Sequence, residues 1–564
     1  MTAGPATGRD RAVRQPVRRE SWLALAGCLL GVFMQMLDTT IVNIALPDLT
    51  ADLGASTSEQ LLVLTVYTLA FACTLLTAAT LGGRWGRRRM FITAMVAFTV
   101  TSVLCGLATD PLALIVFRGA QGISAALMSA QTLALIAALF GKDLHGLVFG
   151  VYGAVAGLAA ILGPVIGGLL VDADLFGWGW RTIFFVNVPL AVVACVLARR
   201  RLPTARDPDP VPPDIVGMLL SGAGLFGLLY PLAVGREQEW PARLWLMMAV
   251  AVVLLAAFVG HERALMRRGG APLLRMDLFA SRRFRVGLTL SLLFFSVFAG
   301  FFFTVSISAQ FGLGYSALHT GLLALPFAVG AAGGSILSPA IVARTSAATT
   351  LGTGAATLAV AFCWLAAVID PATETLSVPT ILAPLILGGI GTGLFVAPLQ
   401  TVILSDTSEQ TVGSASGTIP TVQQIGASLG LAVVTIFFFG QVATQTTTAV
   451  PAVRADLTMA LADSGVQPLF VPIVADRFAS CATAQLQSAH PERPAPRCSA
   501  DDTRTPTDGP VATAVTLARP AIQEAAAAVT ASTFLGAFQI TLWVLAGITA
   551  AIAMLTALVR AGRR

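Results

Sequence analysis

Apolar residues along this chain fall in blocks of about 20, separated by short polar or glycine- and proline-rich breaks. One α-helix needs a block of that length to cross the hydrocarbon core of a membrane. The pattern therefore predicts an all-α integral membrane protein with fourteen transmembrane helices. We place these helices approximately at residues 22–46, 61–82, 90–108, 112–139, 147–171, 180–198, 214–233, 242–260, 286–310, 319–342, 349–368, 379–404, 418–441 and 534–559.

Composition supports the same class. The chain has 564 residues, of which 56% are hydrophobic and 11% are charged. In a water-soluble protein about a quarter of the residues are charged. An ordinary water-soluble protein is therefore excluded.

The positions of the basic residues predict the orientation, because cytoplasmic loops of membrane proteins are rich in Arg and Lys. With a cytoplasmic N-terminus, the short outside loops hold only Arg181, Arg236 and Arg243. We therefore expect both termini in the cytoplasm, which requires an even number of spans. Arginine far outnumbers lysine, which suggests a GC-rich bacterium and hence a bacterial cytoplasmic membrane. Topology accounts for the net charge of +6, so we expect no nucleic-acid partner.

The spacing of the spans predicts two six-helix halves with a helical pair inserted between them. Transporters are commonly built from such halves, with the substrate site at mid-membrane between them. We divide the chain into a disordered cytoplasmic tail at 1–20, an N-terminal half at 21–198, linkers with the inserted helices at 199–285, and a C-terminal half at 286–564. The last includes an extracytoplasmic loop, 442–533, with room for one or two short helices.

Two of the seven cysteines lie in that loop, and the other five lie in apolar spans. An extracytoplasmic location permits a disulfide between Cys481 and Cys498, while two unpaired thiols remain the alternative. No second cysteine or histidine pair accompanies them, so the spacing does not resemble a zinc site.

Asp38 lies deep in the first predicted span, in QMLDTTIVNIALP, and no other acid lies so deep in any span. A charge inside a membrane is costly, so such residues usually face a cavity or a partner. Arg118, in LIVFRGAQGISAA, is the base deep in the fourth span. Counted from the outer span ends, the two groups lie at depths of roughly 12 and 10 Å, so they can pair. One interpretation is a structural ion pair, and our hypothesis is an acid that alternately releases a proton and binds Arg118.

The fifth span contains glycines four residues apart, Gly163 and Gly167 among them. Small residues at this spacing let helix backbones approach closely. Pro164 lacks a backbone donor and marks a kink site. Taken alone, the pattern indicates helix packing and no chemistry.

Together these motifs resemble the fourteen-helix drug:proton antiporter family of the major facilitator superfamily, over nearly the whole chain except the tail and 442–533. By resemblance, Asp38 and Arg118 are proton-coupling residues. The matching motifs are LDTTIVNIALP from Leu37 to Pro47, Arg118 with Gln121 and Gly122, the antiporter motif Gly163, Pro164, Gly167 and Gly168, WRTIFFVNVP from Trp180 to Pro189, Gly314-Tyr315-Ser316, and GSASG from Gly413 to Gly417.

The loop after the second span departs from that pattern. The superfamily has G-x-L-x-D-R-x-G-R-R/K, whereas this chain has Ala79 for the first glycine and Gly83 for the acid. By resemblance, the acid helps latch the outward-facing state. Without it, either the gate relies on the glycines and arginines alone, or the balance shifts toward the inward-facing state. The remaining gating-loop residues, whose arginines topology alone also explains, are Arg84, Gly86, Arg87 and Arg88.

The resemblance implies a monomer that exports a hydrophobic or amphipathic small molecule across the lipid bilayer, driven by protons through alternating access, with no cofactor. Because Asp38 is the one deep acid, a cavity for neutral, weakly basic or anionic compounds is favoured over one for a multiply charged cation. Each candidate cavity residue would equally well pack between helices. The candidates are Met34, Gln35, Gln121, Gln310, Gln400, Gln423 and Gln424, with Phe298 and Phe302 as apolar surface.

Two other functions remain open. One is a transporter of the same fold that moves lipids or metabolites, or works as an importer. The other is a non-transporting membrane sensor that binds an outside partner through 442–533. The four histidines are scattered without paired metal spacing, so we expect neither an enzyme nor a metal site.

Overall fold

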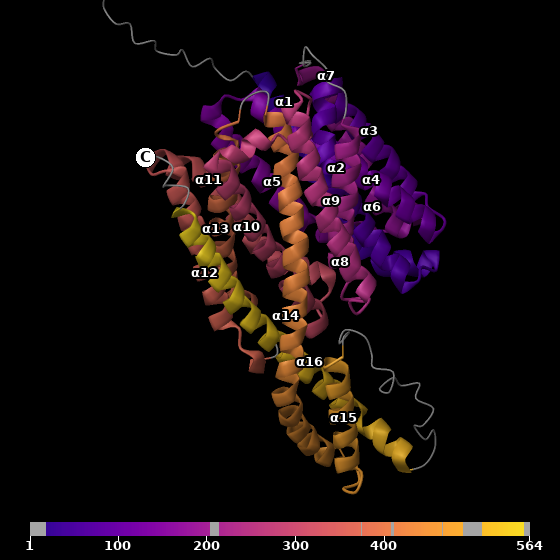
Figure 1. The fold of residues 1–564 in the computed structure, drawn as a ribbon. Helices are drawn as coiled ribbons and strands as arrows, with labels where there is room; N and C mark the ends of the chain where they lie inside the picture. The colour runs from indigo at the N-terminus through magenta and orange to yellow at the C-terminus, as the bar shows by residue number, and fades with distance from the viewer. Residues whose placement is uncertain are drawn as a thin grey trace, which may run out of the picture.

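The computed structural model describes residues 19–203, 214–373, 375–407, 411–464, 466–488 and 510–557. Over these ranges the secondary structure is helical and contains no strand. Long helices lie side by side in one bundle, from which a helical protrusion extends at one end (Figure 1). Thirteen described helices are long and apolar enough to cross a membrane, and α5, with 31 residues, is the fourteenth.

The N-terminal half contains six of these spans. Polar caps define several helix starts: the Ser56 hydroxyl accepts from the Glu59 amide, and the Asp110 carboxylate accepts from the Ala113 amide. The sixth span is broken into short helical pieces. The elements are α1 (Arg19–Leu53), α2 (Thr57–Trp85), α3 (Arg87–Gly106), α4 (Pro111–Leu139), α5 (Lys142–Asp172), η1 (Leu175–Gly177), η2 (Gly179–Arg181), α6 (Thr182–Phe185) and α7 (Asn187–Arg201).

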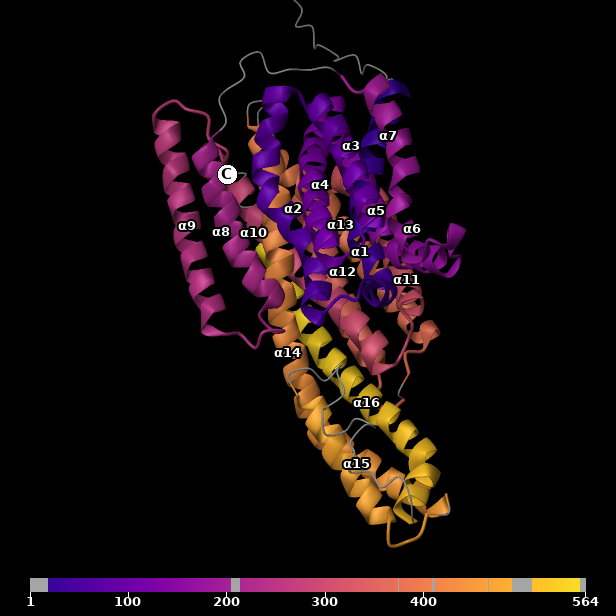
Figure 2. The ribbon, with the colours of Figure 1, turned by 90° about the vertical axis from the view of Figure 1, so that its right-hand side faces the viewer.

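The inserted pair consists of α8 (Ile215–Val234) and α9 (Ala242–Arg267), followed by the short turn η3 (Met276–Ala280). The two helices approach closely at Gly227, where a Cβ would lie 3.0 Å from the Ala251 Cβ. Helix α8 also packs on α2. Figure 2 shows the pair at the edge of the bundle, with α9 outermost.

The C-terminal half supplies the remaining spans. Its elements are α10 (Arg282–Ile307), the π-helical turn η4 (Ser308–Gly312), α11 (Ala317–Arg344), α12 (Ala347–Val368), η5 (Pro371–Thr373), α13 (Val378–Leu404), α14 (Val412–Asp463), α15 (Val471–Leu486) and α16 (Pro510–Leu555).

The region 442–533 differs from the predicted loop with one or two short helices. Helix α14 continues without a break for 52 residues, about 78 Å at 1.5 Å per residue, against roughly 30 Å of hydrocarbon core. Helix α16 likewise begins before its span, and α15 lies against both helices in the protrusion (Figure 1). Buried side chains such as Leu457, Leu461 and Ala475 stabilise this extension. The hydropathy pattern marks only the apolar part of each helix that crosses the membrane. Helices α14 and α16 continue beyond that part and pack with α15.

Cys481, in α15, is disulfide-bonded in the structure. Its expected partner, Cys498, lies outside the described residues. The predicted tail lies there too, except for Arg19 and Glu20, which form the start of α1.

The two halves contact each other at the end of the bundle opposite the protrusion. There α5 packs on α11, and a Cβ built on Gly150 would lie 2.7 Å from the Ser335 carbonyl oxygen. Helix α2 packs on α14, where a Cβ on Gly417 would lie 2.6 Å from the Ala79 Cβ. A larger residue at either glycine would push the helices apart, so the halves are closed together at this end.

Candidate functional site

Asp38 and Arg118 form an ion pair inside the N-terminal half, with 2.5 Å between Asp38 Oδ2 and Arg118 Nη1. Asp38, on α1, is 0% exposed, and Arg118, on α4, is 1% exposed. Gln121 lies three residues after Arg118 on the same face of α4. Its Nε2 donates to Asp38 Oδ1 at 2.9 Å, and its Oε1 accepts from Arg118 Nη1 at 2.8 Å. The structure thus brings together three residues that the sequence singled out.

Asn187, the first residue of α7, adds a second amide to the network. Its Nδ2 lies 3.4 Å from Asp38 Oδ1 and 3.0 Å from the Ser102 hydroxyl. That hydroxyl donates to the Phe184 carbonyl at 2.9 Å, so α3 holds Asn187 at the break between α6 and α7. Asp38 Oδ1 therefore accepts hydrogen bonds from two helices, while Oδ2 accepts from Arg118.

Arg118 has further contacts that do not depend on Asp38. Its Nε donates to the Val63 carbonyl at 3.4 Å, and its guanidinium lies 4.4 Å from the centroid of the Tyr67 ring. A cation over an aromatic face is stabilised by the ring quadrupole. The Tyr67 hydroxyl in turn donates to the Gln35 carbonyl at 3.5 Å. Neither of the two Arg118 contacts involves the Asp38 carboxylate.

The glycines of the fifth span lie directly beside this network. A Cβ on Gly163 would overlap the Thr40 hydroxyl, and one on Gly167 would lie 2.9 Å from the Ile41 Cγ1. Pro164 follows Gly163 in α5, whereas a Cβ on Gly168 would meet nothing within 4 Å. Helix α5 therefore packs on α1 within one turn of Asp38. The contacts agree with the helix-packing interpretation, and they link that packing to the charged site.

The gating loop forms the turn between α2 and α3. Gly86 has φ 90°, a conformation that favours glycine. Arg87 donates to the Ala134 carbonyl of α4, and Arg88 donates to the Arg199 carbonyl of α7, while Arg84 is exposed. The halves are closed at this end although position 83 is glycine. Arg87 and Arg88 bond within the N-terminal half, so both alternatives for the missing acid stay open.

The candidate cavity residues come from both halves of the bundle. Gln121 belongs to the charged network, and the Gln35 side chain on α1 is buried with its Oε1 unpartnered. Phe298 and Phe302 lie in the C-terminal half, with ring centroids 4.9 Å apart. Among the remaining polar candidates, Gln310 donates to Ser306, Gln424 is partly buried, and Gln400 and Gln423 each have a buried polar atom without a hydrogen bond. A described cavity of about 700 Å³ between α2, α8 and α9 contains none of the candidates.

Glu262 is a second buried acid, and it lies outside the spans to which the prediction about Asp38 applies. It is 0% exposed near the end of α9, beyond the predicted span limit of residue 260. Its Oε2 accepts from the Leu274 amide at 3.2 Å. The neighbouring His261 bonds to Asp214 at 2.8 Å. The segment before η3 folds back over the helix end and buries this acid, which span counting cannot reveal.

Sequence reasoning missed Tyr67 and Ser102, and it quoted Asn187 only as part of the WRTIFFVNVP motif. Asn187 carried a usable signal, because it stands alone in the apolar run IFFVNVPLAVV of the sixth span. Buried amides in a membrane need hydrogen-bond partners, so an isolated asparagine there points to a polar neighbour. Tyr67 and Ser102 carried none, since single hydroxyls are common in such helices.

Two groups of six membrane-crossing helices, closed against each other at one end and holding a buried acid–arginine pair, define a secondary transporter. The chain belongs to the Major Facilitator Superfamily, whose family model matches residues 28–431.

Relatives support this assignment. The chain is 37% identical over 447 residues to a probable actinorhodin transporter of Streptomyces coelicolor, covering 79% of this chain and 77% of the relative. It is 35% identical over 416 residues to a puromycin resistance protein of Streptomyces alboniger, covering 73% and 80%. The fold is similar to the crystal structure of the human organic anion transporter MFSD10, with TM-score 0.52, 17% identity, and coverage of 74% and 93%.

Proposed function

We propose that this transporter exports hydrophobic or amphipathic small molecules in exchange for protons, by alternating access. The observation that carries the proposal is the buried pair of Asp38 and Arg118. Asp38 also accepts a hydrogen bond from Gln121, and Arg118 has contacts with Val63 and Tyr67 that do not involve Asp38. The names of the relatives, an antibiotic transporter and an antibiotic resistance protein, support export of this class of compound.

The geometry suggests how proton binding acts on the gate. Ionised Asp38 pairs with Arg118, and protonation removes the charge attraction that holds the pair. The pair lies within one turn of the packing of α1 on α5, and α5 also forms the contact with α11 that closes the two halves. Helix α5 therefore connects the Asp38 site on α1 to the contact with α11, which must open during transport.

The substrate belongs between the halves, near the charged network on one side and the phenylalanines of α10 on the other. One deep acid next to an arginine carries no net charge, so it does not favour a multiply charged cation. We propose a neutral, weakly basic or anionic compound. We also propose that both termini lie in the cytoplasm, with the protrusion outside, and that the transporter works as a monomer.

Purified protein in proteoliposomes with an internal pH dye tests the coupling. We expect an added drug such as puromycin to drive proton movement in the opposite direction, and an imposed pH gradient to drive drug accumulation. A vesicle preparation with Arg118→Lys serves as a matched control, because it keeps the charge but loses the planar fork of the guanidinium. Drug movement that ignores the pH gradient, or that follows the protons, would contradict the proposal.

A further inference from the structure

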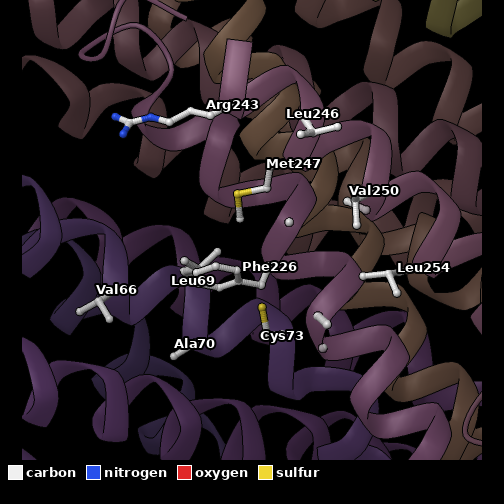
Figure 3. Close-up of a pocket in the computed structure, with 14 residues that line it drawn as sticks. Val66, Leu69, Ala70, Cys73, Phe226, Arg243, Leu246, Met247, Val250 and Leu254 are labelled. Carbon is white, nitrogen blue, oxygen red and sulfur yellow. The ribbon is translucent and has the colours of Figure 1, made fainter. Parts of the chain in front are cut away.

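An apolar cavity of about 700 Å³ lies between α2 and the inserted pair α8 and α9 (Figure 3). Its volume is within the range of about 300–1,000 Å³ typical of small-ligand sites. Helix α8 forms the back with small residues such as Gly222 and Ala223, while Leu69 and Val250 line opposite walls. Apart from Arg243, the lining residues are apolar. Such a surface favours a hydrocarbon chain over a polar ligand.

The depth of the cavity matches one leaflet of a bilayer. Its lining on α9 runs from Arg243, in the first turn, to Leu254. The eleven helical steps from Arg243 to Leu254 span about 16 Å, and half of the hydrocarbon core is about 15 Å thick. The cavity thus extends from the surface on the protrusion side to the middle of the membrane.

Arg243 lies at the same end of this cavity as Leu246, away from Leu254 (Figure 3). The nearby rings of Trp240 and Trp245 have centroids 5.3 Å apart, and tryptophans at helix ends mark the headgroup level. One hydrogen bond of 2.8 Å joins Arg243 Nη2 to Gln238 Oε1. A guanidinium has five N–H donors, so others remain for a phosphate.

The position of this arginine is otherwise unexplained. The short loops on this side hold few basic residues, as the topology requires. Of the three arginines in these short loops, Arg181 pairs with Asp52 at 2.5 Å, and Arg236 stacks 3.6 Å above the centroid of the Phe439 ring. Within the described residues, Arg243 forms no ion pair with a carboxylate. The phosphate of an anionic headgroup would supply a counter-charge for Arg243.

We propose that this cavity binds an anionic phospholipid of the leaflet on the protrusion side, with one acyl chain between α2 and α9 and the phosphate on Arg243. The lipid fills the gap that the inserted pair leaves beside α2. Because α2 also packs on α14 at the closed end, the bound chain supports a helix of the gate. The proposal rests on this cavity alone and is independent of proton coupling.

Native mass spectrometry of the full-length protein, purified in detergent, tests the site with phosphatidylglycerol and phosphatidylcholine of identical chains. We expect wild type to retain phosphatidylglycerol about fivefold better, the effect of one surface arginine on an anionic lipid. Arg243→Gln should remove this preference. Gly222→Leu should lose both lipids at this site, because a Cβ there has only the Cys73 carbonyl oxygen nearby, at 3.9 Å, and the added side chain fills the cavity.

Gly260→Leu is the matched control for Gly222→Leu. It lies on α9, a Cβ there meets nothing within 4 Å, and it does not line the cavity, so lipid retention should stay as in wild type. Equal retention of the two lipids by wild type would overturn the proposal. So would unchanged retention of phosphatidylglycerol by Gly222→Leu. Loss of drug efflux in Gly222→Leu with normal lipid retention would assign the cavity to the transported compound instead. A lipid preference in protein that does not transport would leave the site standing and refute only the proposed function.

Discussion

The cores of the two halves differ in chemistry although both lie inside six-helix groups. In the N-terminal half, α1, α4 and α7 meet in a hydrogen-bonded network around Asp38 and Arg118. In the C-terminal half, α10, α11 and α13 meet through phenylalanines such as Phe294 and Phe395, whose ring centroids are 4.6 Å apart. Among the described residues of that half, no charged side chain is buried.

From this difference we infer that the two halves have separate tasks. A buried ion pair is sensitive to a single proton, because removal of either charge leaves the other without compensation. A cluster of aromatic rings is insensitive to protons but presents a large apolar surface. We therefore expect changes in the N-terminal core to affect coupling, and changes in the C-terminal core to affect the choice of compound.

Asp38→Asn should have the largest effect on transport. The amide keeps the shape of the side chain but cannot release a proton, so drug efflux should fall to the level of cells without the transporter. The measurement is drug accumulation in cells that lack other pumps, with membrane insertion checked by immunoblot. Asp38→Glu is the control and should be partly active if titration is what matters. Full efflux by Asp38→Asn at neutral pH would refute the coupling role.

Arg118→Met separates coupling from structure. Alone, it leaves the Asp38 carboxylate without its partner and should cost about 3–5 kcal/mol of unfolding free energy. Combined with Asp38→Asn, it removes both charges, and stability should largely return while efflux stays absent. Thermal unfolding in detergent and drug accumulation measure the two effects. If the double variant regained efflux, the pair would be purely structural.

Asn187→Ala should have a smaller effect. Asp38 Oδ1 would keep Gln121 as a donor, but the Ser102 hydroxyl would lose its amide partner. Leaving such buried groups unsatisfied costs about 1–3 kcal/mol. We expect reduced efflux with proton coupling retained, measured as the drug-to-proton ratio in proteoliposomes. An unchanged unfolding temperature would argue that these hydrogen bonds do not form.

Phe302→Ala tests the other side of the comparison. The ring contacts Phe298, Phe301 and Phe327 and is only partly buried. Losing part of that apolar surface should weaken drug binding by about 1–3 kcal/mol and raise the KM for bulky compounds more than for small ones. The drug-to-proton ratio should not change. A changed ratio would show that coupling extends into the C-terminal half.

The smallest effect is expected at the surface, for Asp52→Asn. Hydrogen bonds from Arg181 and Trp180 lower the pKa of Asp52, so its contribution to stability is present at neutral pH and lost as pH falls through the lowered pKa. Because the pair is exposed, the cost at pH 7 should be at most about 1 kcal/mol. Unfolding temperatures of the variant and wild type should converge in acid. A difference that persists there would indicate a role beyond the ion pair.

The fold and half of the site could be predicted from the sequence. The apolar blocks are periodic, and a charged residue inside a membrane is rare because its burial costs free energy. Apolar blocks gave the spans, and depth counting gave the pairing of Asp38 with Arg118. The helical extension of α14 was not accessible, since its residues beyond the membrane are too polar for a hydropathy pattern and pack on α15 and α16. Asn187 and Glu262 depend on a helix break and on a folded-back segment, which are tertiary features.

Because α14 is unbroken, a tilt of this helix moves both of its ends. Its first turns, around Gly417, touch α2 at the closed gate, and its last turns form the protrusion. From the middle of the membrane near Gly430 to Asp463 the helix extends about 50 Å, so each degree of tilt moves the tip by about 0.9 Å. A small tilt of α14 thus produces a larger displacement at the protrusion than at the contact with α2. A fluorophore pair placed on the protrusion and on the rim of the N-terminal half would read the transport cycle from outside the membrane.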